Sequence, residues 1–276
     1  MNNPRQLVVF TDLDGTLLDH DTYSFDAARP ALAELHRRRI PLIVCTSKTA
    51  AEILELRAAI GNRDPFISEN GGGVFIPYRF FSFSVNAGRT AAGCHVLELG
   101  TCYSTLHEAL GAIMRATGLA LRGFSMMEAE EVAALCNFSS WQAALAKQRD
   151  YDEPFVLARP EDATPAAAAL LAAAAARLGL RVTRGGRFFH LTGDNDKGRA
   201  VRMLKELFVR QYGTVYTLAL GDSANDGPML READVAVLMQ KKDGSYDAAI
   251  KNPVVRFGAP GPAGWNEAVM QMLDAR

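Results

Sequence analysis

Two aspartates, one residue apart, follow an apolar segment near the N-terminus. Residues 7–10 predict a short buried strand, which runs into Asp12, Asp14 and Gly15. Because residues i and i+2 of an extended segment point the same way, we expect both carboxylates on one side and Leu13 packed on the other. Such close carboxylates repel each other unless a cation lies between them or one of them is protonated. Both a bound cation and a protonated carboxylate are useful in catalysis. The alternative to a functional pair of aspartates is a plain polar loop after a strand.

A second acidic cluster follows another apolar segment late in the chain. Residues 217–220 predict a strand, and Asp222, Asn225 and Asp226 come directly after it. Ligand sites of open parallel sheets lie beyond the carboxyl ends of the strands. The two clusters therefore fit one shared metal site. The alternative for the second cluster is an Asn-Asp turn that caps the next helix, and both roles can hold together.

The elements that must position these clusters alternate between strands and helices. The sequence predicts a helix over residues 26–39, with Asp26 as its cap, and a second helix after Thr49, where Glu52 completes a capping box. Further strands are expected at residues 42–45 and 66–68. This alternation predicts the α/β class, with a Rossmann-like parallel sheet and helices on both faces. Towards the C-terminus we expect a helix, a strand, a loop and a closing helix, at residues 199–208, 235–238, 258–264 and 265–273.

The two acidic clusters resemble motifs of the haloacid dehalogenase superfamily of phosphatases. The resemblance rests on Asp12-Leu13-Asp14-Gly15-Thr16-Leu17 and Gly221-Asp222-Ser223-Ala224-Asn225-Asp226. The Asn225-Asp226 ending and the inserted middle segment are similar to the sugar-phosphatase branch. Four weaker motifs resemble the mannosyl-3-phosphoglycerate phosphatase family, namely Cys45-Thr46-Ser47-Lys48-Thr49, Ser68-Glu69-Asn70-Gly71-Gly72-Gly73, Tyr151-Asp152-Glu153-Pro154-Phe155 and Arg187-Phe188-Phe189-His190-Leu191.

The pattern of strands and helices changes after residue 83. The superfamily resemblance implies a cap over the active site, so we expect residues 84–187 to form an inserted α/β cap domain. The catalytic core is then formed by residues 1–83 and 188–276. Within the cap, the alanine-rich stretch 165–178 predicts an ordered helix, because Thr164 can cap it and Gly179 follows its end. Other expected elements of the cap are a strand at 96–99, helices at 103–116, 128–135 and 141–147, and a strand at 155–157.

The superfamily resemblance implies hydrolysis of a phosphate monoester through a phospho-aspartyl enzyme. Asp12 is then the nucleophile, a role that carboxylates can take towards phosphorus. Asp14 is the general acid for the leaving alkoxide and later the base for the attacking water. The implied cofactor is Mg²⁺, bound by Asp12, the backbone carbonyl of Asp14 and Asp222, with Asp226 bound directly or through water.

Two further side chains match phosphate-binding positions of the superfamily. Thr46 lies at the end of the second expected core strand and matches the phosphate-binding hydroxyl. Lys197, in Asn195-Asp196-Lys197-Gly198, matches the lysine that contacts both the nucleophile and the phosphate. Fixed donors of this kind stabilise the charge that develops on the transferring oxygens.

The residues that would bind the rest of the substrate are less determined. Arginine suits a carboxylate because of its bidentate fork. Arg184-Gly185-Gly186-Arg187 fits either a ligand-binding loop or a simple hairpin turn with exposed charges, and His190 fits either a ligand contact or a satisfied core histidine. The full set of substrate-binding candidates is Ser47, Lys48, Asn70, Arg149, Glu153, Arg187, His190 and Asn225.

Bulk properties narrow the classes of partner. The chain has 276 residues, 49% hydrophobic residues and a formal net charge of −1, so it has no bulk attraction to nucleic acid or an anionic membrane. Its four cysteines form no C-x-x-C pair, which favours free thiols and an intracellular protein. The polar residues 1–6 do not resemble a signal peptide, and no apolar run reaches the ~20 residues that span a bilayer. We therefore expect a cytoplasmic enzyme with a small-molecule partner.

The sequence thus predicts a Mg²⁺-dependent phosphatase whose favoured substrate, by resemblance, is mannosyl-3-phosphoglycerate. One alternative is a phosphatase for another glycosyl-phosphoglycerate or sugar phosphate. A second is a mutase of the phosphomannomutase type, which rephosphorylates the sugar. The third is a non-catalytic sugar-phosphate sensor, which has no need of both an aspartate nucleophile and its acid partner.

Overall fold

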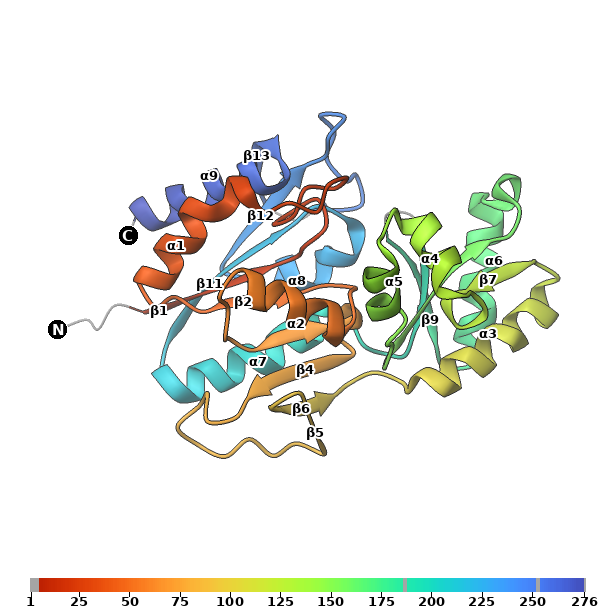
Figure 1. The fold of residues 1–276 in the computed structure, drawn as a ribbon, viewed down its shortest axis with the longest axis horizontal. Helices are drawn as coiled ribbons and strands as arrows, with labels where there is room; N and C mark the ends of the chain where they lie inside the picture. The colour runs from red at the N-terminus through yellow and green to blue at the C-terminus, as the bar shows by residue number, and fades with distance from the viewer. Residues whose placement is uncertain (1–4, 186–187, 252–253, 276) are drawn as a thin grey trace.

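A long twisted sheet forms the centre of the larger part of the molecule (Figure 1). The computed structural model describes residues 5–185, 188–251 and 254–275. Within them, the strand order of the larger sheet is β13-β12-β11-β1-β2-β3-β4-β6-β5. The six strands from β13 to β3 are parallel, and β4, β6 and β5 continue the sheet in antiparallel pairs. Their bounds are β1 Gln6–Thr11, β2 Leu42–Cys45, β3 Phe66–Ser68, β4 Gly73–Pro77, β5 Arg89–Ala91, β6 Cys94–Glu98, β11 Val215–Gly221, β12 Val235–Gln240 and β13 Val255–Pro260.

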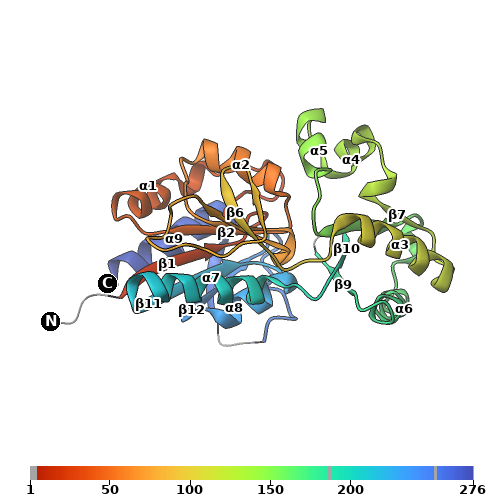
Figure 2. The same cartoon turned by 90° about the horizontal axis from the view of Figure 1, so that it is seen from below.

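Helices cover both faces of this sheet, as the alternation predicts (Figure 2). Val9 and Leu13 belong to an apolar cluster with α1, α2 and α9, whereas Val8 and Phe10 pack with α7 and α8 on the other face. The period of two along β1 therefore sends successive side chains into two separate cores. The helices are α1 Arg29–Arg37, α2 Ala50–Ala59, α7 Lys197–Tyr212, α8 Gly227–Glu232 and α9 Gly261–Asp274.

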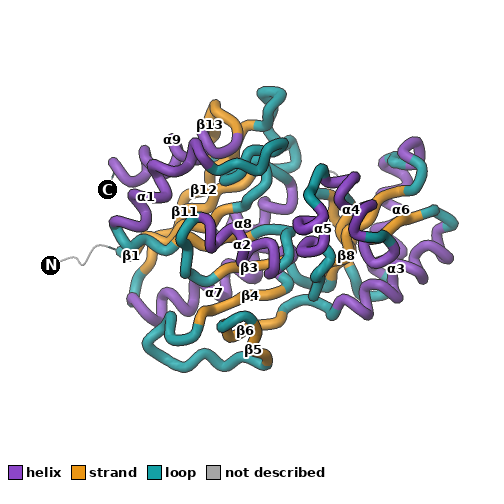
Figure 3. Tube along the Cα trace, in the orientation of Figure 1, coloured by secondary structure: helices purple, strands orange, loops and turns teal. Residues whose placement is uncertain are grey.

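The smaller part has its own antiparallel sheet, in the order β7-β8-β10-β9. One face of this sheet packs on α3 and α6, and α4 and α5 pack against the opposite side. Figure 3 shows this unit at one end of the core sheet, with α5 as the cap helix beside α2. Its elements are α3 Tyr103–Thr117, β7 Leu121–Gly123, α4 Ala129–Cys136, α5 Ser140–Ala146, β8 Asp152–Leu157, α6 Pro165–Ala176, β9 Arg181–Arg184 and β10 Phe189–Thr192.

Strand pairing differs from the sequence-based division at both ends of the cap. Residues 94–98 pair with β4 in the core sheet, although we expected residues from 84 onward in the cap. Residues 189–192 pair with β8 in the cap sheet, although we expected the core to resume at 188. A short apolar strand does not reveal which sheet it joins, because that depends on distant partners. We therefore propose that the cap extends from about residue 99 to residue 193, between β6 and α7.

The predicted helix starts are confirmed at two positions. The Thr49 hydroxyl accepts a hydrogen bond from the Glu52 N–H at 3.2 Å, and the Glu52 carboxylate accepts one from the Thr49 N–H at 2.9 Å. Thr164 accepts a hydrogen bond from the N–H of Ala167 and caps α6. Asp26, by contrast, does not cap α1, because it lies in a separate 3₁₀ turn and pairs with Arg29.

The loop expected at residues 258–264 is wrong. Residues 255–260 form β13, which pairs with β12 through an irregularity at Met239 and Gln240. α9 then begins at Gly261, and Pro262 lies in its first turn, where a helix does not need a proline N–H. Among the described residues, no helix is both long enough and apolar enough to cross a membrane.

Candidate active site

The site lies at the carboxyl end of β1, an inner strand of the core sheet, and Asp12 is the first residue after this strand. Its carboxylate is 9% exposed. Lys197, the first residue of α7, places its ammonium 2.7 Å from Asp12 Oδ1 and 2.6 Å from Asp226 Oδ1. Asp196 caps α7 through the N–H of Arg199, which fixes the first turn that carries Lys197. One buried ammonium therefore joins the two acidic clusters predicted from the sequence.

Three carboxylates converge at this point. Asp12, Asp222 and Asp226 each offer an oxygen, and these oxygens all lie within 4.8 Å of one another. Gly15 makes room for the group, because a Cβ at this position would lie 2.9 Å from Asp222 Oδ2, and its φ of +77° favours glycine. With one ammonium among three carboxylates, the cluster has two uncompensated negative charges when ionised, which matches a divalent cation. Carboxylate oxygens are also the ligands that Mg²⁺ prefers.

Burial and the neighbouring charges shift the pKa values of the members of this cluster. Burial raises the pKa of Asp12 well above its usual value, and the neighbouring carboxylate of Asp226 raises it further. Burial and Asp226 also raise the pKa of Asp222 to about 7. Burial lowers the pKa of Lys197, but the carboxylates of Asp12 and Asp226 outweigh this and raise it above its usual value. The lysine therefore stays charged, whereas burial and mutual repulsion both disfavour the ionised carboxylates.

Asp226 is held from two sides. Its Oδ2 accepts hydrogen bonds from the backbone N–H groups of Asp222 and Ser223, both at 3.0 Å, while Oδ1 accepts from Lys197. The Asp226 carboxylate thus closes the 3₁₀ turn Ala224–Asp226 through Ser223, but its side chain makes no cap hydrogen bond to α8, so the helix-capping alternative is not found. The Asp226 carboxylate therefore both closes a backbone turn and pairs with the Lys197 ammonium.

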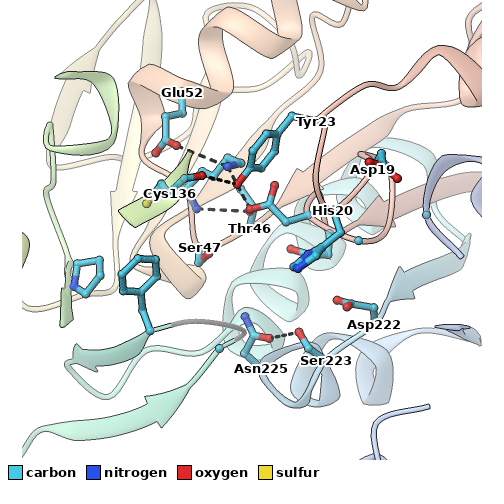
Figure 4. A pocket seen from close by; sticks show the side chains of 18 of the residues that line it. Asp19, His20, Tyr23, Thr46, Ser47, Glu52, Cys136, Asp222, Ser223 and Asn225 are labelled. Atoms are coloured by element: carbon cyan, nitrogen blue, oxygen red, sulfur yellow. Dashed lines mark hydrogen bonds and ion pairs between the residues drawn. The ribbon is translucent and has the colours of Figure 1, made fainter. Parts of the chain in front are cut away.

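A pocket of about 530 Å³ lies over this cluster, between the core and the cap. Figure 4 shows Thr46, His20 and Asp222, from three different segments, around one space. Asp12 and Asp14 both line the pocket, and Leu13 is fully buried, as the i, i+2 spacing predicts. Thr46 lies at the end of β2, where its hydroxyl accepts a hydrogen bond from the N–H of Lys48 at 3.4 Å.

Most of the predicted substrate-binding residues line the same pocket. Those residues are Ser47, Lys48, Arg149, His190 and Asn225. Asn70 does not line it, and its amide instead donates to Asp152 Oδ2 at 2.8 Å and accepts from Asn225 at 3.1 Å. Arg187 lies outside the described residues, and Gly185 N–H donates to the carbonyl of Phe188 at 3.0 Å, in the hairpin that joins β9 and β10.

Glu153 does not line the pocket because of the alternation along β8. Pro154 lines the pocket opposite His190, whereas Phe155 lies on the other face, in the core formed with α3 and α6. Glu153 shares the face of Phe155 and accepts a hydrogen bond from the N–H of Ser125 at 3.1 Å. Its carboxylate therefore belongs to the interior of the cap.

The sequence reasoning missed a buried network that joins the cap to the core. Asp152 accepts from Asn70 and lies 2.8 Å from His190 Nδ1, so His190 is both hydrogen-bonded and exposed to the pocket. Glu69 accepts from three successive backbone N–H groups at residues 150–152. Both Glu69 and Asn70 have left-handed backbones, with φ of +48° and +54°. The motifs that contain these residues are visible in the sequence, but their contacts span 38 to 155 residues.

The comparisons with known proteins decide the family. A family model described as haloacid dehalogenase-like hydrolase matches residues 9–80. A glucosyl-3-phosphoglycerate/mannosyl-3-phosphoglycerate phosphatase of Methanococcoides burtonii is 46% identical over 267 residues, covering 96% of this chain and 97% of the relative. The chain belongs to the haloacid dehalogenase-like hydrolases.

Other relatives and solved structures agree with this membership. A protein of Persephonella marina with the same dual phosphatase name is 37% identical, covering 97% of each chain. A mannosyl-3-phosphoglycerate phosphatase of Pyrococcus furiosus is 34% identical, covering 84% of this chain and 90% of its own. The structure of the haloacid dehalogenase subclass IIB sugar phosphatase BT4131 superposes with a TM-score of 0.66 at 18% identity, covering 96% and 98% of the two chains. At 18% identity, this superposition shows only that the two proteins share a fold.

Several pocket residues of this hydrolase were not foreseen. The loop after β1 contributes Asp19, His20 and Tyr23, and the loop after β12 contributes Lys241 and Lys242. Lys242 forms ion pairs with Asp19 and Asp21 and so joins the two loops. The sequence indicated only that these two loops are polar. The strand order of the sheet brings both loops to the pocket, and that order is not visible in the sequence.

Proposed function

We propose that this hydrolase removes phosphate from mannosyl-3-phosphoglycerate through a phospho-aspartyl intermediate on Asp12. The observation that supports the proposal is the buried Lys197 ammonium, which holds Asp226 and Asp12 together, with Asp12 lining the pocket between core and cap. Relatives that span nearly the whole chain carry the names of phosphatases for this class of ester. Cys102 is an exposed free thiol, which supports the cytoplasm as the proposed location.

In the first step, an oxygen of Asp12 forms a bond to phosphorus as the ester P–O bond breaks. Asp14 gives its carboxyl proton to the leaving glycerate alkoxide. In the second step, the carboxylate of Asp14 takes a proton from a water molecule, whose oxygen attacks phosphorus and releases Asp12. Lys197 and the hydroxyl of Thr46 donate to the phosphoryl oxygens, on which charge accumulates.

The cluster of carboxylates fits Mg²⁺, which when bound offsets the repulsion between Asp12 and an anionic phosphate. We assign the ion to Asp12, Asp222 and the backbone carbonyl of Asp14. For Asp226 we propose contact through water, because both of its oxygens already accept hydrogen bonds from protein groups.

The remaining pocket residues suit the other half of such a substrate. Arg149 is held by the Ser47 and Ala146 carbonyls, so its guanidinium is fixed at the pocket wall as a partner for the glycerate carboxylate. His190, kept in place by Asp152, and Asn225 are proposed partners for sugar hydroxyls. Arg187 stays a candidate from the sequence.

Glucosyl-3-phosphoglycerate is a second candidate substrate. Two relatives, of Methanococcoides burtonii and Persephonella marina, carry both sugar names. The two sugars differ only in the orientation of one hydroxyl. We therefore propose the mannosyl compound first and the glucosyl compound beside it.

The test is phosphate release from a panel of esters with and without Mg²⁺. The panel contains mannosyl- and glucosyl-3-phosphoglycerate, hexose phosphates and 3-phosphoglycerate. We expect Mg²⁺-dependent release with the highest kcat/KM for the glycosyl-phosphoglycerates. Equal, slow release from all esters would contradict the proposed substrate, and dependence on a sugar bisphosphate activator would favour a mutase. Binding of esters without any release would favour the sensor.

A further inference from the structure

Lys48 lies among negative groups at the edge of the pocket. Its ammonium is 3.1 Å from Asp14 Oδ2 and 3.6 Å from Glu52 Oε1, and its side chain is only 12% exposed. Two carboxylates so close to one amine favour its ammonium form.

Two aromatic rings complete the surroundings of this ammonium. Lys48 Nζ lies 4.9 Å from the ring centroid of Tyr23 and 5.2 Å from that of Phe138, distances at which a ring face attracts a cation. The two rings are themselves in contact, with centroids 5.3 Å apart. Tyr23 belongs to the loop after β1, and Phe138 belongs to the cap, between α4 and α5. The ammonium of Lys48, a residue that follows β2, thus contacts both the segment after β1 and the cap.

We propose that Lys48 is a positioning residue for proton transfer by Asp14, and that Phe138 of the cap completes the site that holds it. The inference rests on the proposed function, in which Asp14 is the general acid. It differs from the substrate-binding role that the sequence suggested for Lys48.

The contacts of the two Asp14 oxygens indicate how Lys48 acts. An ammonium has only donors, so Oδ2 accepts from Lys48. Oδ1 is buried and has no hydrogen-bond partner among residues 5–185, 188–251 and 254–275. Because the Asp14 side chain is 37% exposed although Oδ1 is buried, Oδ2 is its accessible oxygen, and Lys48 holds Oδ2 in the position from which it gives the proton to the leaving alkoxide. After the ester bond breaks, the same oxygen takes the proton from the attacking water.

The surroundings of Lys48 disfavour direct binding of substrate. Two carboxylates and two ring faces already surround its ammonium, and a substrate carboxylate would have to displace one of them. Arg149 lines the same pocket and is held there by backbone carbonyls. The Asp152 carboxylate also lies 3.9 Å from Arg149, but these partners use only part of the five N–H donors of the guanidinium. Arg149 is therefore the better partner for an anionic substrate group, and Lys48 is left to orient Asp14.

The cap takes part because Phe138 reaches Lys48 only when the cap lies against the core. The contact is supported nearby by a hydrogen bond from the Thr49 hydroxyl to the Leu145 carbonyl of α5, at 3.0 Å. Movement of the cap away from the core would remove one ring from the ammonium. Positioning of the general acid is thereby coupled to cap closure.

The test compares two esters in the first turnover of the variant Lys48→Met. One is mannosyl-3-phosphoglycerate, whose alkoxide needs a proton, and the other is 2,4-dinitrophenyl phosphate, whose phenolate leaves without one. We expect the first-turnover rate with the alkyl ester to fall by about 100-fold, within the range of general acid catalysis. The burst of dinitrophenolate and the KM values should change by less than about threefold, because Asp12 and the phosphate contacts are intact.

Two further variants extend the comparison. Lys48→Arg keeps the cation, so it should recover part of the rate with the alkyl ester. Phe138→Leu removes only the cap ring, and we expect the same selective loss at about tenfold. The matched control is Lys205→Met, because Lys205 also pairs with a carboxylate, that of Asp234, but lies outside the pocket. It should leave the ratio of the two first-turnover rates unchanged.

The inference is overturned if Lys48→Met lowers both rates equally, or if it changes only the KM of the alkyl ester. The first result would indicate a structural role and the second a substrate contact. An unchanged alkyl rate in Phe138→Leu would remove the cap from the proposal. Failure of the proposed function is distinct, because the wild-type chain would then release no phosphate from the alkyl ester.

Discussion

Lys197 is the residue on which the two halves of the candidate site depend. Its ammonium is fully buried between Asp12 and Asp226, so its removal would leave two carboxylates without their cation. Removing one partner of a buried ion pair is costly because the remaining charge is poorly solvated. The same lysine is a proposed phosphate donor, so stability and turnover should decline together.

For Lys197→Met we expect the free energy of unfolding to fall by about 3–5 kcal/mol, the usual cost of breaking a buried pair. The measurement is denaturant unfolding in the presence of EDTA. Lys205→Met is the control, since its partly exposed pair with Asp234 should be worth about 1 kcal/mol or less. Equal losses in the two variants would contradict a buried ion-pair cluster centred on Lys197.

Cys102 directly precedes α3, and the reactivity of its thiol tests the hydrogen bonds at the start of this helix. Hydrogen bonds from Ser104 and Thr105 lower the pKa of its exposed thiol to about 7. A lowered pKa means that thiolate forms at lower pH, so alkylation by iodoacetamide should rise between about pH 6 and 8 and then level off. Peptide mass spectrometry distinguishes Cys102 from the buried Cys45, Cys94 and Cys136.

The control for this titration is the double variant Ser104→Ala, Thr105→Val. It removes both hydroxyl donors, so the alkylation midpoint should move towards the ordinary thiol value. A wild-type rate that still increases steeply above about pH 9 would contradict the hydrogen bonding at the start of α3.

At the scale of elements, two helical glycines provide a matched pair. A Cβ on Gly198, in the first turn of α7, would lie 2.6 Å from the backbone carbonyl oxygen of Pro228 in α8. A Cβ on Gly111, within α3, would meet only the flexible end of Arg115 at 3.5 Å. The close packing of α7 on α8 places Lys197 beside the second acidic cluster, so Gly198 serves the site through packing.

We expect Gly198→Ala to lower the melting temperature and the turnover number together, because α7 must shift away from α8 and Lys197 moves with it. Gly111→Ala should instead stabilise the protein by about 0.5–1 kcal/mol, the usual gain of alanine over glycine in a helix. Differential scanning calorimetry and phosphate release measure both quantities. A stabilising Gly198→Ala would contradict the contact between α7 and α8.

The sequence predicted the elements of the site better than their assembly. Asp12, Asp14 and Asp222 were predicted because strand periodicity and strand ends are local features. The role of Asp152 and the sheet to which β10 belongs were not, because each depends on residues distant in the chain. Glu153 was placed in the pocket because the sequence does not show which face of β8 is turned towards it.

In the whole molecule, the carboxylate cluster in the core is connected to the cap by hydrogen bonds. The network from His190 through Asp152 and Asn70 to Asn225 runs from the cap sheet to the second acidic cluster. A cation that neutralises the cluster should therefore stabilise the folded chain as well as support turnover. Binding to the folded state alone raises stability by mass action.

We expect each tenfold increase in free Mg²⁺ above its dissociation constant to raise the free energy of unfolding by about 1.4 kcal/mol. Denaturant titrations at several Mg²⁺ concentrations measure this slope. Asp222→Asn removes one proposed ligand and should shift the onset to higher Mg²⁺ concentration. The same onset in both proteins would contradict the placement of the ion at this cluster.

Rapid acid quenching of the enzyme during its first turnover, followed by peptide mass spectrometry, can identify the nucleophile. We predict a transient phosphoryl group on the peptide that contains Asp12, forming before free phosphate and absent from Asp12→Asn. The variant should remain folded while its phosphate release falls to background. A phosphoryl group on another residue, or phosphate release at near-normal rates from Asp12→Asn, would contradict Asp12 as the nucleophile.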